Sequence, residues 1–272
     1  MDNSASTKIL LVGASSLVGR AVAEQAQRRG LALTAISHRQ IDDVDFGAYD
    51  AVLNMAYDLR YRRAAYDIAF DFDREVAARA ARHGVHFVMM STRRVYGAAG
   101  SAPIPETALT APIDEYGRNK LITEQAILDL SGGRCTILRL ANAFGFEPGR
   151  HTFFGVALDN LRYRKRITLD ANPFVRKDFF PLPDCADAIV SVLRKNPTGI
   201  FNLGYGTATE IGRIAMWLIE GYAEGELLVT STEERDGFLL DSSKLRALVN
   251  MPKPSSSIRD YCIEIGNRLR NA

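Results

Sequence analysis

Short apolar runs alternate with longer amphipathic segments through the first half of the chain. The runs have the length and composition of strands, whereas the segments between them repeat their apolar residues at helical spacing. Strands that alternate with helices predict βαβ units, and therefore a parallel sheet covered by helices on both faces. The five runs are KILLV (8–12), ALTAI (32–36), AVLNM (51–55), VHFVMM (85–90) and CTILRL (135–140).

The alternation weakens in the second half of the chain. Residues 146–177 are expected to be loop-rich and basic, and one further strand is expected at GIFNLG (199–204). We therefore predict an α/β fold: a Rossmann-like, doubly wound parallel sheet with a small C-terminal lobe that binds substrate. The sheet domain is expected to take 1–145 plus about 178–204, and the lobe about 146–177 plus 205–272.

Composition and charge fit this picture and exclude some partners. The 272 residues, 47% of them hydrophobic, can bury a large core. With 34 basic and 32 acidic side chains, the formal net charge of +2 predicts neither nucleic acid nor an anionic membrane as a partner. No run reaches the about 20 apolar residues of a membrane span, so we expect a cytoplasmic protein. Three widely spaced cysteines and four scattered histidines predict no disulfide framework and no metal site.

The first predicted strand runs into a glycine-containing turn, GASSLVG (13–19), and then into a helix. This arrangement places free backbone N–H groups and the positive end of the helix dipole where a pyrophosphate can bind. Ser16 stands where a glycine usually lets the backbone approach the phosphates, and a turn without any ligand stays the alternative. The residues expected to contact a dinucleotide here are Gly13, Ser15, Ser16, Leu17, Val18 and Gly19.

The residues after the second predicted strand favour NADP over NAD. This position usually holds an Asp or Glu that binds the adenosine ribose of NAD and repels a 2′-phosphate. Here it holds Ser37, His38 and Arg39, with no carboxylate. Ser37 and Arg39 are suited to a 2′-phosphate, whereas an Arg39 that only stacks on the adenine or faces solvent would leave NAD open.

The segment EYGRNKLITE (115–124) places Tyr116 and Lys120 four residues apart on a predicted helix. This spacing puts the phenol and the ammonium on one face. A phenol, with a reference pKa of about 10, is a weak acid–base catalyst near neutral pH, and a nearby cation stabilises its phenolate. An isolated pair of this kind would be read as an ordinary surface pair. The glycine turn and the strand end STRRVYG (91–97) favour a catalytic role for Tyr116.

Together these motifs resemble the extended short-chain dehydrogenase/reductase family, in particular its epimerase/dehydratase and nucleotide-sugar reductase group. The resemblance covers nearly the whole chain. The segments that carry it are GASSLVG (13–19), AVLNMA (51–56), STRRVYG (91–97), EYGRNK (115–120), LRLANAFG (138–145), KDFFPLPDCADAIV (177–190), FNLGYG (201–206) and LDSSKLRALVNMPKPS (240–255).

The resemblance implies a role for each matching residue. Tyr116 becomes the acid/base, and Lys120 the cation that stabilises its phenolate and binds the nicotinamide ribose. Thr92, rather than Ser91, becomes the hydroxyl that bonds the reacting oxygen. Further contacts are Met55, Ala56, Leu140 and Ala141 along the cofactor, and Asn142 and Lys177 at the substrate. Lys177 replaces an arginine that usually binds the substrate diphosphate, so the bidentate fork is lost.

Two arginines follow Thr92 where the dehydratases of this family carry an Asp-Glu pair. Arg93 and Arg94 therefore disfavour dehydration and become candidate contacts for an anionic substrate. We expect an NADPH-preferring reductase of a keto group on a nucleotide-activated sugar, with Tyr116 as proton donor. An NAD-dependent nucleotide-sugar 4-epimerase is the alternative enzyme, and a non-catalytic dinucleotide sensor or scaffold is the alternative of another class.

The segment before the fourth predicted strand carries a cluster of arginines and a departure from the family pattern. Arg60, Arg62 and Arg63 are expected to head a helix with the Ala-rich pattern REVAARAAR (74–82), which the resemblance places at a homodimer interface. An asparagine that the family shows in this region appears here as Phe70 or Asp71.

Overall fold

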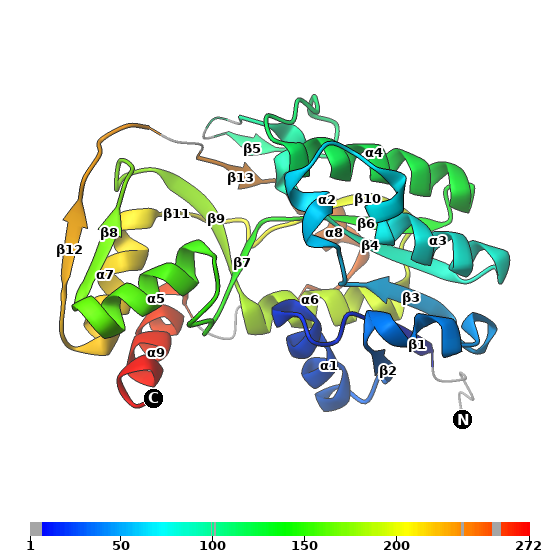
Figure 1. Ribbon diagram of the computed structural model, residues 1–272, viewed down its shortest axis with the longest axis horizontal. Coiled ribbons are helices and arrows are strands. Elements are labelled where there is room, and N and C mark those ends of the chain that lie inside the picture. The colour runs from blue at the N-terminus through cyan, green and yellow to red at the C-terminus, as the bar shows by residue number, and fades with distance from the viewer. Residues whose placement is uncertain (1–6, 99, 101, 235–236, 252–256) are drawn as a thin grey trace.

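A six-stranded, all-parallel sheet lies at the centre of the computed structural model, which describes residues 7–98, 100, 102–234, 237–251 and 257–272 (Figure 1). The strand order is β10-β6-β4-β3-β1-β2. These strands are β1 (Lys8–Val12), β2 (Ala32–Ile36), β3 (Ala51–Asn54), β4 (His86–Thr92), β6 (Cys135–Leu140) and β10 (Gly199–Leu203). The predicted parallel sheet is confirmed, and β4 continues past the expected apolar run into Ser91 and Thr92.

Helices cover both faces of this sheet, as the doubly wound prediction requires. Alternate residues of β1 point to opposite faces: Ile9 and Leu11 belong to one apolar core, Leu10 and Val12 to another. The first core packs against α1 (Leu17–Arg28), α6 (Leu182–Lys195) and α8 (Ser243–Leu248), and the second against α3 (Phe72–Arg82) and α4 (Glu115–Ser131).

A smaller region lies beside the sheet, at the left in Figure 1. It contains a three-stranded sheet of β11 (Ala208–Glu210), β9 (Arg176–Pro181) and β7 (Asn142–Phe144), the pair β8 (Arg166–Leu169) and β12 (Glu226–Val229), and the helices α5 (Phe153–Arg164), α7 (Ile211–Tyr222) and α9 (Ile258–Arg270). It has its own apolar core, in which the rings of Phe144 and Phe154 stack at 4.4 Å. We call this region the lobe.

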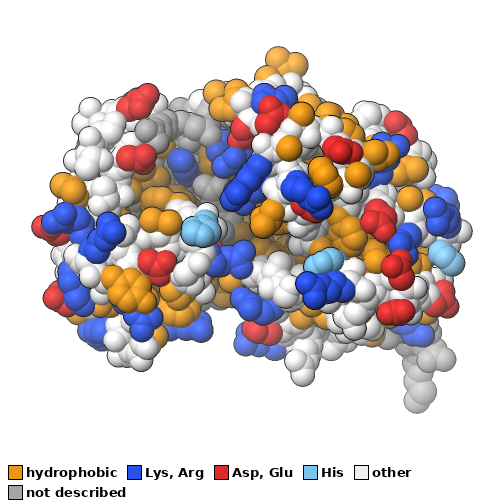
Figure 2. Space-filling model, in the orientation of Figure 1, with side chains coloured by type: hydrophobic (Ala, Val, Ile, Leu, Met, Phe, Trp, Pro, Cys, Tyr) orange, Lys and Arg blue, Asp and Glu red, His pale blue; other side chains and the backbone are white. Residues whose placement is uncertain are grey.

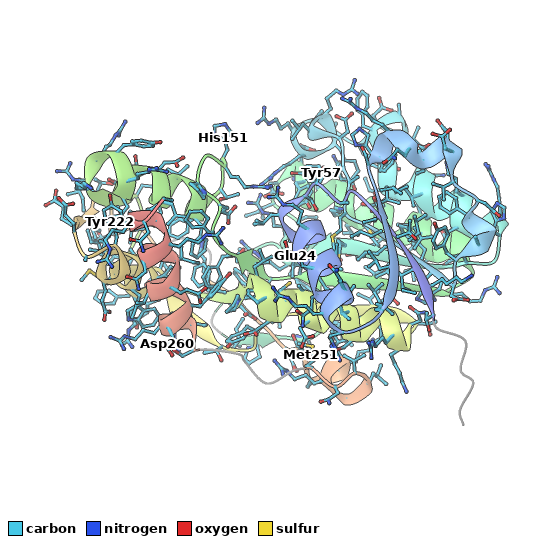
Figure 3. The ribbon with its side chains drawn as sticks, turned by 90° about the horizontal axis from the view of Figure 1, so that it is seen from below. Glu24, Tyr57, His151, Tyr222, Met251 and Asp260 are labelled. Carbon is cyan, nitrogen blue, oxygen red and sulfur yellow. The ribbon has the colours of Figure 1, made fainter. Side chains whose placement is uncertain are left out.

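The lobe and the sheet domain share the C-terminal part of the chain. Tyr222 and Asp260 lie in the lobe, whereas Met251 packs against the core of the sheet domain (Figure 3). Leu245 and Val249 are buried in that same core. A short parallel pair, β5 (Pro103–Ile104) with β13 (Leu239–Leu240), also joins distant parts of the chain. The proposed division of the chain into two domains stays a prediction, and residues 252–255 of the last family-like motif lie outside the described residues.

Two sequence expectations are wrong. Residues 146–177 are not mainly loop, because they contain α5, β8 and the start of β9. Thr152 caps α5 by accepting a hydrogen bond from the Gly155 N–H at 2.9 Å. Arg60, Arg62 and Arg63 do not head the Ala-rich helix. They form a separate short helix, α2 (Leu59–Arg63), and α3 begins only at Phe72.

Three further features of the described residues concern membrane spans, metal sites and cysteines. No helix in the described ranges is long and apolar enough to cross a membrane. The same ranges contain no group of three His, Cys, Asp or Glu side chains placed to hold a metal ion. Cys135, Cys185 and Cys262 are buried and free.

Candidate active site

The parallel register brings the predicted cofactor residues to one edge of the sheet. β1 pairs with β2 on one side and with β3 on the other. Gly13, Ser37 and Met55 each directly follow one of these three strands, and Thr92 lies beside Leu140 in the β4–β6 pair. Open α/β sheets bind ligands at this kind of edge, outside the carboxyl ends of neighbouring strands.

The turn after β1 leaves no room for a side chain at its two glycines. Gly13 has a φ of +89°, and a Cβ there would lie 2.5 Å from the backbone nitrogen of Ala56. A Cβ on Gly19 would lie 2.6 Å from the carbonyl oxygen of Gly13. Ser16 caps α1, since its Oγ accepts a hydrogen bond from the Gly19 N–H at 3.0 Å. The Ser16 hydroxyl proton therefore stays available for a phosphate oxygen at the helix N-terminus.

The other residues expected at this turn and along the cofactor lie around the same edge. Ser15 is exposed in the turn, and Leu17 and Val18 form the first turn of α1. Met55 and Ala56 are half-buried directly after β3. The cradle formed by the glycine turn, the α1 N-terminus and the end of β3 fits a dinucleotide.

The three residues that directly follow β2 are Ser37, His38 and Arg39, and none of them is a carboxylate. Ser37 caps the 3₁₀ helix His38–Asp43, and the Ser37 N–H donates to Gln40 Oε1 at 2.9 Å. The side chains of His38 and Arg39 are exposed, and Arg39 forms no ion pair with another described residue. A free guanidinium at this position suits a 2′-phosphate.

Tyr116 and Lys120 lie in the first turns of α4, at the same edge of the sheet. Asp114 caps this helix by accepting from the Gly117 N–H at 2.8 Å. The Lys120 Nζ lies 5.9 Å from the centroid of the Tyr116 ring. The i, i+4 spacing read from the sequence therefore places the Lys120 ammonium beside the ring of Tyr116.

The two hydroxyls at the end of β4 have different surroundings. Ser91 Oγ donates to the buried carboxylate of Glu124, which also pairs with Arg139 at 2.7 Å. Thr92 is half-buried, and its Oγ1 accepts a long hydrogen bond of 3.3 Å from the Arg94 N–H. The Ser91 hydroxyl is thus used within the core, whereas the Thr92 hydroxyl keeps its proton for a bound molecule.

Arg93 and Arg94 line a small cavity of about 90 Å³ next to Asp114. The guanidinium of Arg93 is buried and lies 4.1 Å from the centroid of the Phe238 ring. Arg94 Nη1 donates to Asp114 Oδ2 at 2.6 Å. Because Asp114 caps the helix that carries Tyr116, the Arg94–Asp114 pair connects the end of β4 to the start of α4.

The remaining candidate residues lie where the sheet domain meets the lobe. Leu140 ends β6 and is half-buried, and the buried Ala141 follows it. Asn142 begins β7, Lys177 lies on the neighbouring β9, and both side chains are half-buried. Lys and Arg side chains gather along the hollow between the two regions (Figure 2). Tyr57 of the sheet domain and His151 of the lobe lie at facing edges of these regions (Figure 3).

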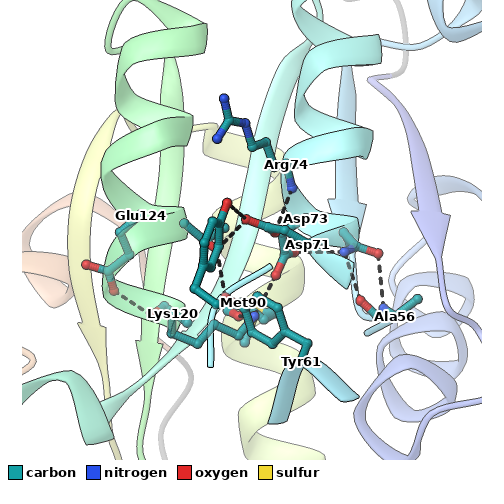
Figure 4. A network of polar contacts seen from close by, with 12 residues as sticks. Ala56, Tyr61, Asp71, Asp73, Arg74, Met90, Lys120 and Glu124 are labelled. Atoms are coloured by element: carbon teal, nitrogen blue, oxygen red, sulfur yellow. Dashed lines mark hydrogen bonds and ion pairs between the residues drawn. The ribbon is translucent and has the colours of Figure 1, made fainter. Parts of the chain in front are cut away.

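No sequence motif indicated the carboxylate that contacts Lys120. Asp73 Oδ2 on α3 lies 2.6 Å from Lys120 Nζ, and both side chains are 4% exposed (Figure 4). Lys120 Nζ also donates to the Met90 carbonyl at 2.8 Å, and Asn54 Nδ2 donates to Asp73 Oδ1 at 2.7 Å. Asp73 thus connects the predicted catalytic lysine to the end of β3, where the cofactor is expected. Its only sequence signal was an acidic residue near the position where an asparagine was expected.

The same contact sets the charge of the lysine. Burial alone lowers the pKa of Lys120, yet the negative charge of Asp73 and its hydrogen bond with Lys120 raise it above its usual value. Lys120 is therefore an ammonium. Two of its three N–H groups are used by Asp73 and Met90, which leaves one for a ligand.

Arg62 lies on α2, whereas the sequence pattern placed it at the head of the Ala-rich helix. Its guanidinium carbon lies 5.5 Å from the centroid of the Tyr116 ring, so a second cation faces the predicted acid/base. Tyr57 and Tyr61 complete this aromatic surrounding, each with its ring centroid 6.5 Å from that of Tyr116. This contact could not be read from the sequence, because α2 reaches α4 only through tertiary packing.

Comparison with known proteins gives two kinds of relative. Residues 7–198 match the protein family described as RmlD substrate binding domain. A dTDP-4-keto-6-deoxy-D-glucose reductase of Streptomyces niveus is 28% identical over 232 residues, covering 77% of this chain and 78% of that protein. A UDP-glucose 4-epimerase of Azospirillum brasilense is 31% identical over 173 residues, covering 55% of this chain and 49% of that protein. This chain thus spans about half the length of that epimerase.

Two solved structures have the same fold. RMD from Pseudomonas aeruginosa complexed with NADPH superimposes with a TM-score of 0.79 at 20% identity, over 97% of this chain and 99% of that one. The complex of a Thermus thermophilus UDP-glucose 4-epimerase with NAD superimposes with a TM-score of 0.80 at 18% identity, over 98% and 100% of the two chains. At these identities the similarity establishes the fold.

Proposed function

Because the chain belongs to the extended short-chain dehydrogenase/reductase family, we propose that it is an NADP-dependent reductase of a keto group on a nucleotide-activated sugar. The observation that carries this proposal is the position of Tyr116. The ring of Tyr116 lies beside the Lys120 ammonium. The same sheet edge carries the turn with Gly13 and Gly19, where a Cβ would clash with the backbone. Proton transfer and dinucleotide binding are thereby combined at one place.

Each residue of the site has a task in such a reaction. Gly13, Ser16 and the N-terminus of α1 hold the diphosphate of the cofactor, and the remaining N–H of Lys120 binds its ribose. NADPH, when bound, supplies the hydride. The Thr92 hydroxyl donates a hydrogen bond to the substrate carbonyl oxygen, and Tyr116 gives that oxygen its proton as negative charge develops there. Asn142, Lys177 and Arg93 are the proposed substrate contacts.

The preference for NADP rests on Ser37 and Arg39. Both follow β2 directly, and the Arg39 guanidinium is exposed and free of any ion pair with described residues. A 2′-phosphate would gain a charge-assisted contact there. The relative solved with NADPH supports this choice, whereas the epimerase solved with NAD supports NAD as the alternative cofactor.

A nucleotide-sugar 4-epimerase is the second candidate, and the Azospirillum brasilense relative favours it. We prefer the reductase because the reductase relative matches over more of both chains. Dehydration is disfavoured, since Arg93 and Arg94 occupy the positions after Thr92 and neither side chain is an acid or base near neutral pH. A non-catalytic dinucleotide sensor is disfavoured because Thr92, Tyr116 and Lys120 are all present.

The test is turnover of NADPH with a dTDP-4-keto-6-deoxy sugar by the wild type and by Tyr116→Phe. We expect net NADPH oxidation by the wild type and a loss of about 10²–10⁴-fold in kcat in the variant, with NADPH affinity retained. Tyr163→Phe, at an exposed tyrosine of α5, is the matched control and should keep full activity. Cofactor binding without turnover in the wild type would leave the sensor interpretation. Equal rates in the wild type and Tyr116→Phe would remove the proposed proton donor.

A further inference from the structure

Asp73 belongs to none of the sequence motifs, yet its carboxylate contacts the lysine of the candidate site. The Oδ2 atom of Asp73 lies 2.6 Å from Lys120 Nζ, and both side chains are 4% exposed (Figure 4). The Met90 carbonyl accepts a second hydrogen bond from the same ammonium at 2.8 Å. Two partners from two different elements, α3 and β4, therefore hold this nitrogen in place.

The carboxylate of Asp73 is also fixed from its other side. Asn54, which is 1% exposed at the end of β3, donates from Nδ2 to Asp73 Oδ1 at 2.7 Å. The Asn54 side chain in turn accepts from the Ala56 N–H and donates to the Ala56 carbonyl, both at 3.0 Å. One oxygen of Asp73 thus bonds to Lys120 and the other to an amide that is itself held, so the carboxylate cannot turn without losing a hydrogen bond.

A lysine side chain needs such partners to keep a single position. It has a flexible four-carbon stem, and its ammonium is a compact charge with three N–H donors that rotate. Ordering this side chain costs conformational entropy, and a site in which the side chain is already ordered binds its ligand more tightly. With two donors of Lys120 used by Asp73 and Met90, one N–H in a fixed position is left for a ligand.

We propose that Asp73 is a positioning residue, which holds the Lys120 ammonium where its remaining N–H binds the nicotinamide ribose of the cofactor. This inference rests on the proposed function, which assigns that ribose to Lys120, and it adds the residue through which Lys120 is oriented. Lys120 keeps its role beside Tyr116. The effect is confined to the nicotinamide half of the cofactor, because the adenosine half is assigned to the glycine turn and to the residues after β2.

The test compares NADPH with adenosine 2′,5′-bisphosphate, which contains the adenosine half of NADPH and lacks the nicotinamide ribose. Both dissociation constants are measured on the complete, folded chain without a sugar substrate. We expect Asp73→Asn to weaken NADPH binding about tenfold, the loss of roughly one charge-assisted contact, and to leave bisphosphate binding unchanged. An asparagine side chain can still accept the hydrogen bond from Asn54, so the change acts on Lys120.

Two further single variants serve as control and as safeguard. Glu75→Gln is the matched control on the same helix: its carboxylate is exposed and pairs with Arg79 at 2.8 Å, so both affinities should stay at their wild-type values. Asp73→Glu keeps a carboxylate as the partner of Lys120 and thereby protects the fold, but its additional methylene displaces the ammonium. It should weaken the binding of NADPH and not that of the bisphosphate.

A double-mutant cycle decides whether Asp73 acts through Lys120. Lys120→Met should weaken NADPH binding, and adding Asp73→Asn to it should cost no further affinity, because no ammonium is left to position. The double variant also removes both members of the buried pair, which avoids an uncompensated buried charge. Additive losses in the cycle, equal losses for the two ligands, or an unchanged NADPH affinity in Asp73→Asn would overturn the proposal.

The outcome can be separated from that of the proposed reaction. No substrate is turned over in these titrations, so a failure to reduce a keto sugar would appear in the turnover assay and not here. A wild type that binds neither ligand would overturn the proposed cofactor and this inference with it. Losses that are equal for the two ligands would overturn the inference alone.

Discussion

The sheet domain and the lobe each hold a buried carboxylate beside a predicted site residue, and the two are stabilised in different ways. Asp73 in the sheet domain pairs with the Lys120 ammonium at 2.6 Å. Asp178, next to Lys177 on β9, accepts hydrogen bonds from three backbone N–H groups of the described residues, those of Tyr205 at 2.9 Å and of Gly206 and Leu240 at 3.4 Å. One carboxylate is held by an opposite charge, the other by the geometry of the main chain.

The two carboxylates differ in what offsets the cost of their burial. Burial raises the pKa of Asp73, whereas the Lys120 ammonium and the hydrogen bonds from Lys120 and Asn54 lower it, so an opposite charge offsets part of the cost of burying this carboxylate. Backbone donors from two segments, 205–206 and Leu240, and the charge of Arg246 only partly offset the burial of Asp178. Burial raises the pKa of Asp178 to about 6, which lets this carboxyl group of the lobe titrate in mild acid. The lobe therefore holds a carboxyl group whose ionisation is expected to change in mild acid.

The largest effect is expected from breaking the buried pair. Asp73→Asn leaves the Lys120 ammonium buried without a counter-charge, which should lower the free energy of unfolding by about 3–5 kcal/mol. Urea denaturation of the two proteins measures this difference. Asp58→Asn is the matched control, because its pair with Arg60 is exposed and asparagine also caps a helix. A loss in Asp58→Asn as large as that in Asp73→Asn would contradict the assigned importance of burial.

A smaller, pH-dependent effect is expected at Asp178. Its pKa of about 6 in the folded protein lies above the usual 3.8, so the unfolded chain loses this proton first as pH rises. The contribution of Asp178 should therefore lower the free energy of unfolding by about 3 kcal/mol between pH 3 and pH 7, and stay constant above that. Asp178→Asn removes the ionisation. Denaturation of both proteins across this range checks the prediction, and a stability difference between them that does not change with pH would refute it.

The smallest effect is expected from an exposed charge at the edge of the sheet domain. Arg39→Ala should leave stability unchanged and reduce the preference for NADPH over NADH by about tenfold, the loss of roughly one charge-assisted contact. The ratio of kcat/KM for the two cofactors measures it. Arg28→Ala, in the last turn of α1 and far from the glycine turn, serves as control. An unchanged ratio in Arg39→Ala would contradict the proposed contact between Arg39 and a 2′-phosphate.

The sheet domain could be predicted from the sequence far better than the lobe. The apolar runs at 8–12, 32–36 and 135–140 coincide with β1, β2 and β6. β1 and β6 are largely buried and therefore continuously apolar, whereas β2 lies at the edge of the sheet and only its Ile36 is buried. Helix α5 was missed, since its apolar face is recognisable only against α7 and α9, which lie far along the chain. Local pattern therefore predicts the elements of the sheet, and tertiary packing decides those of the lobe.

The residues of the candidate site likewise divide into those that local sequence spacing predicts and those that tertiary packing brings together. Tyr116 and Lys120 could be paired from the sequence because an i, i+4 spacing fixes their neighbourhood on one helix. Asp73 contacts Lys120 from a position 47 residues away, and no local pattern indicates such a contact. Arg62 was assigned to another helix altogether. The roles of these residues in binding and catalysis stay predictions, and the homodimer, the cytoplasmic location and the preference for NADP stay predictions as well.

The central claim is that hydride passes from NADPH to the keto carbon of a nucleotide sugar. Incubating the protein with NADPH deuterated at the transferred position and a dTDP-4-keto-6-deoxy sugar, followed by mass spectrometry of the sugar, tests it most directly. The proposal predicts one deuterium on the reduced sugar and an equal amount of NADP⁺. An epimerised sugar without deuterium, formed while the added NADPH stays reduced, would contradict it.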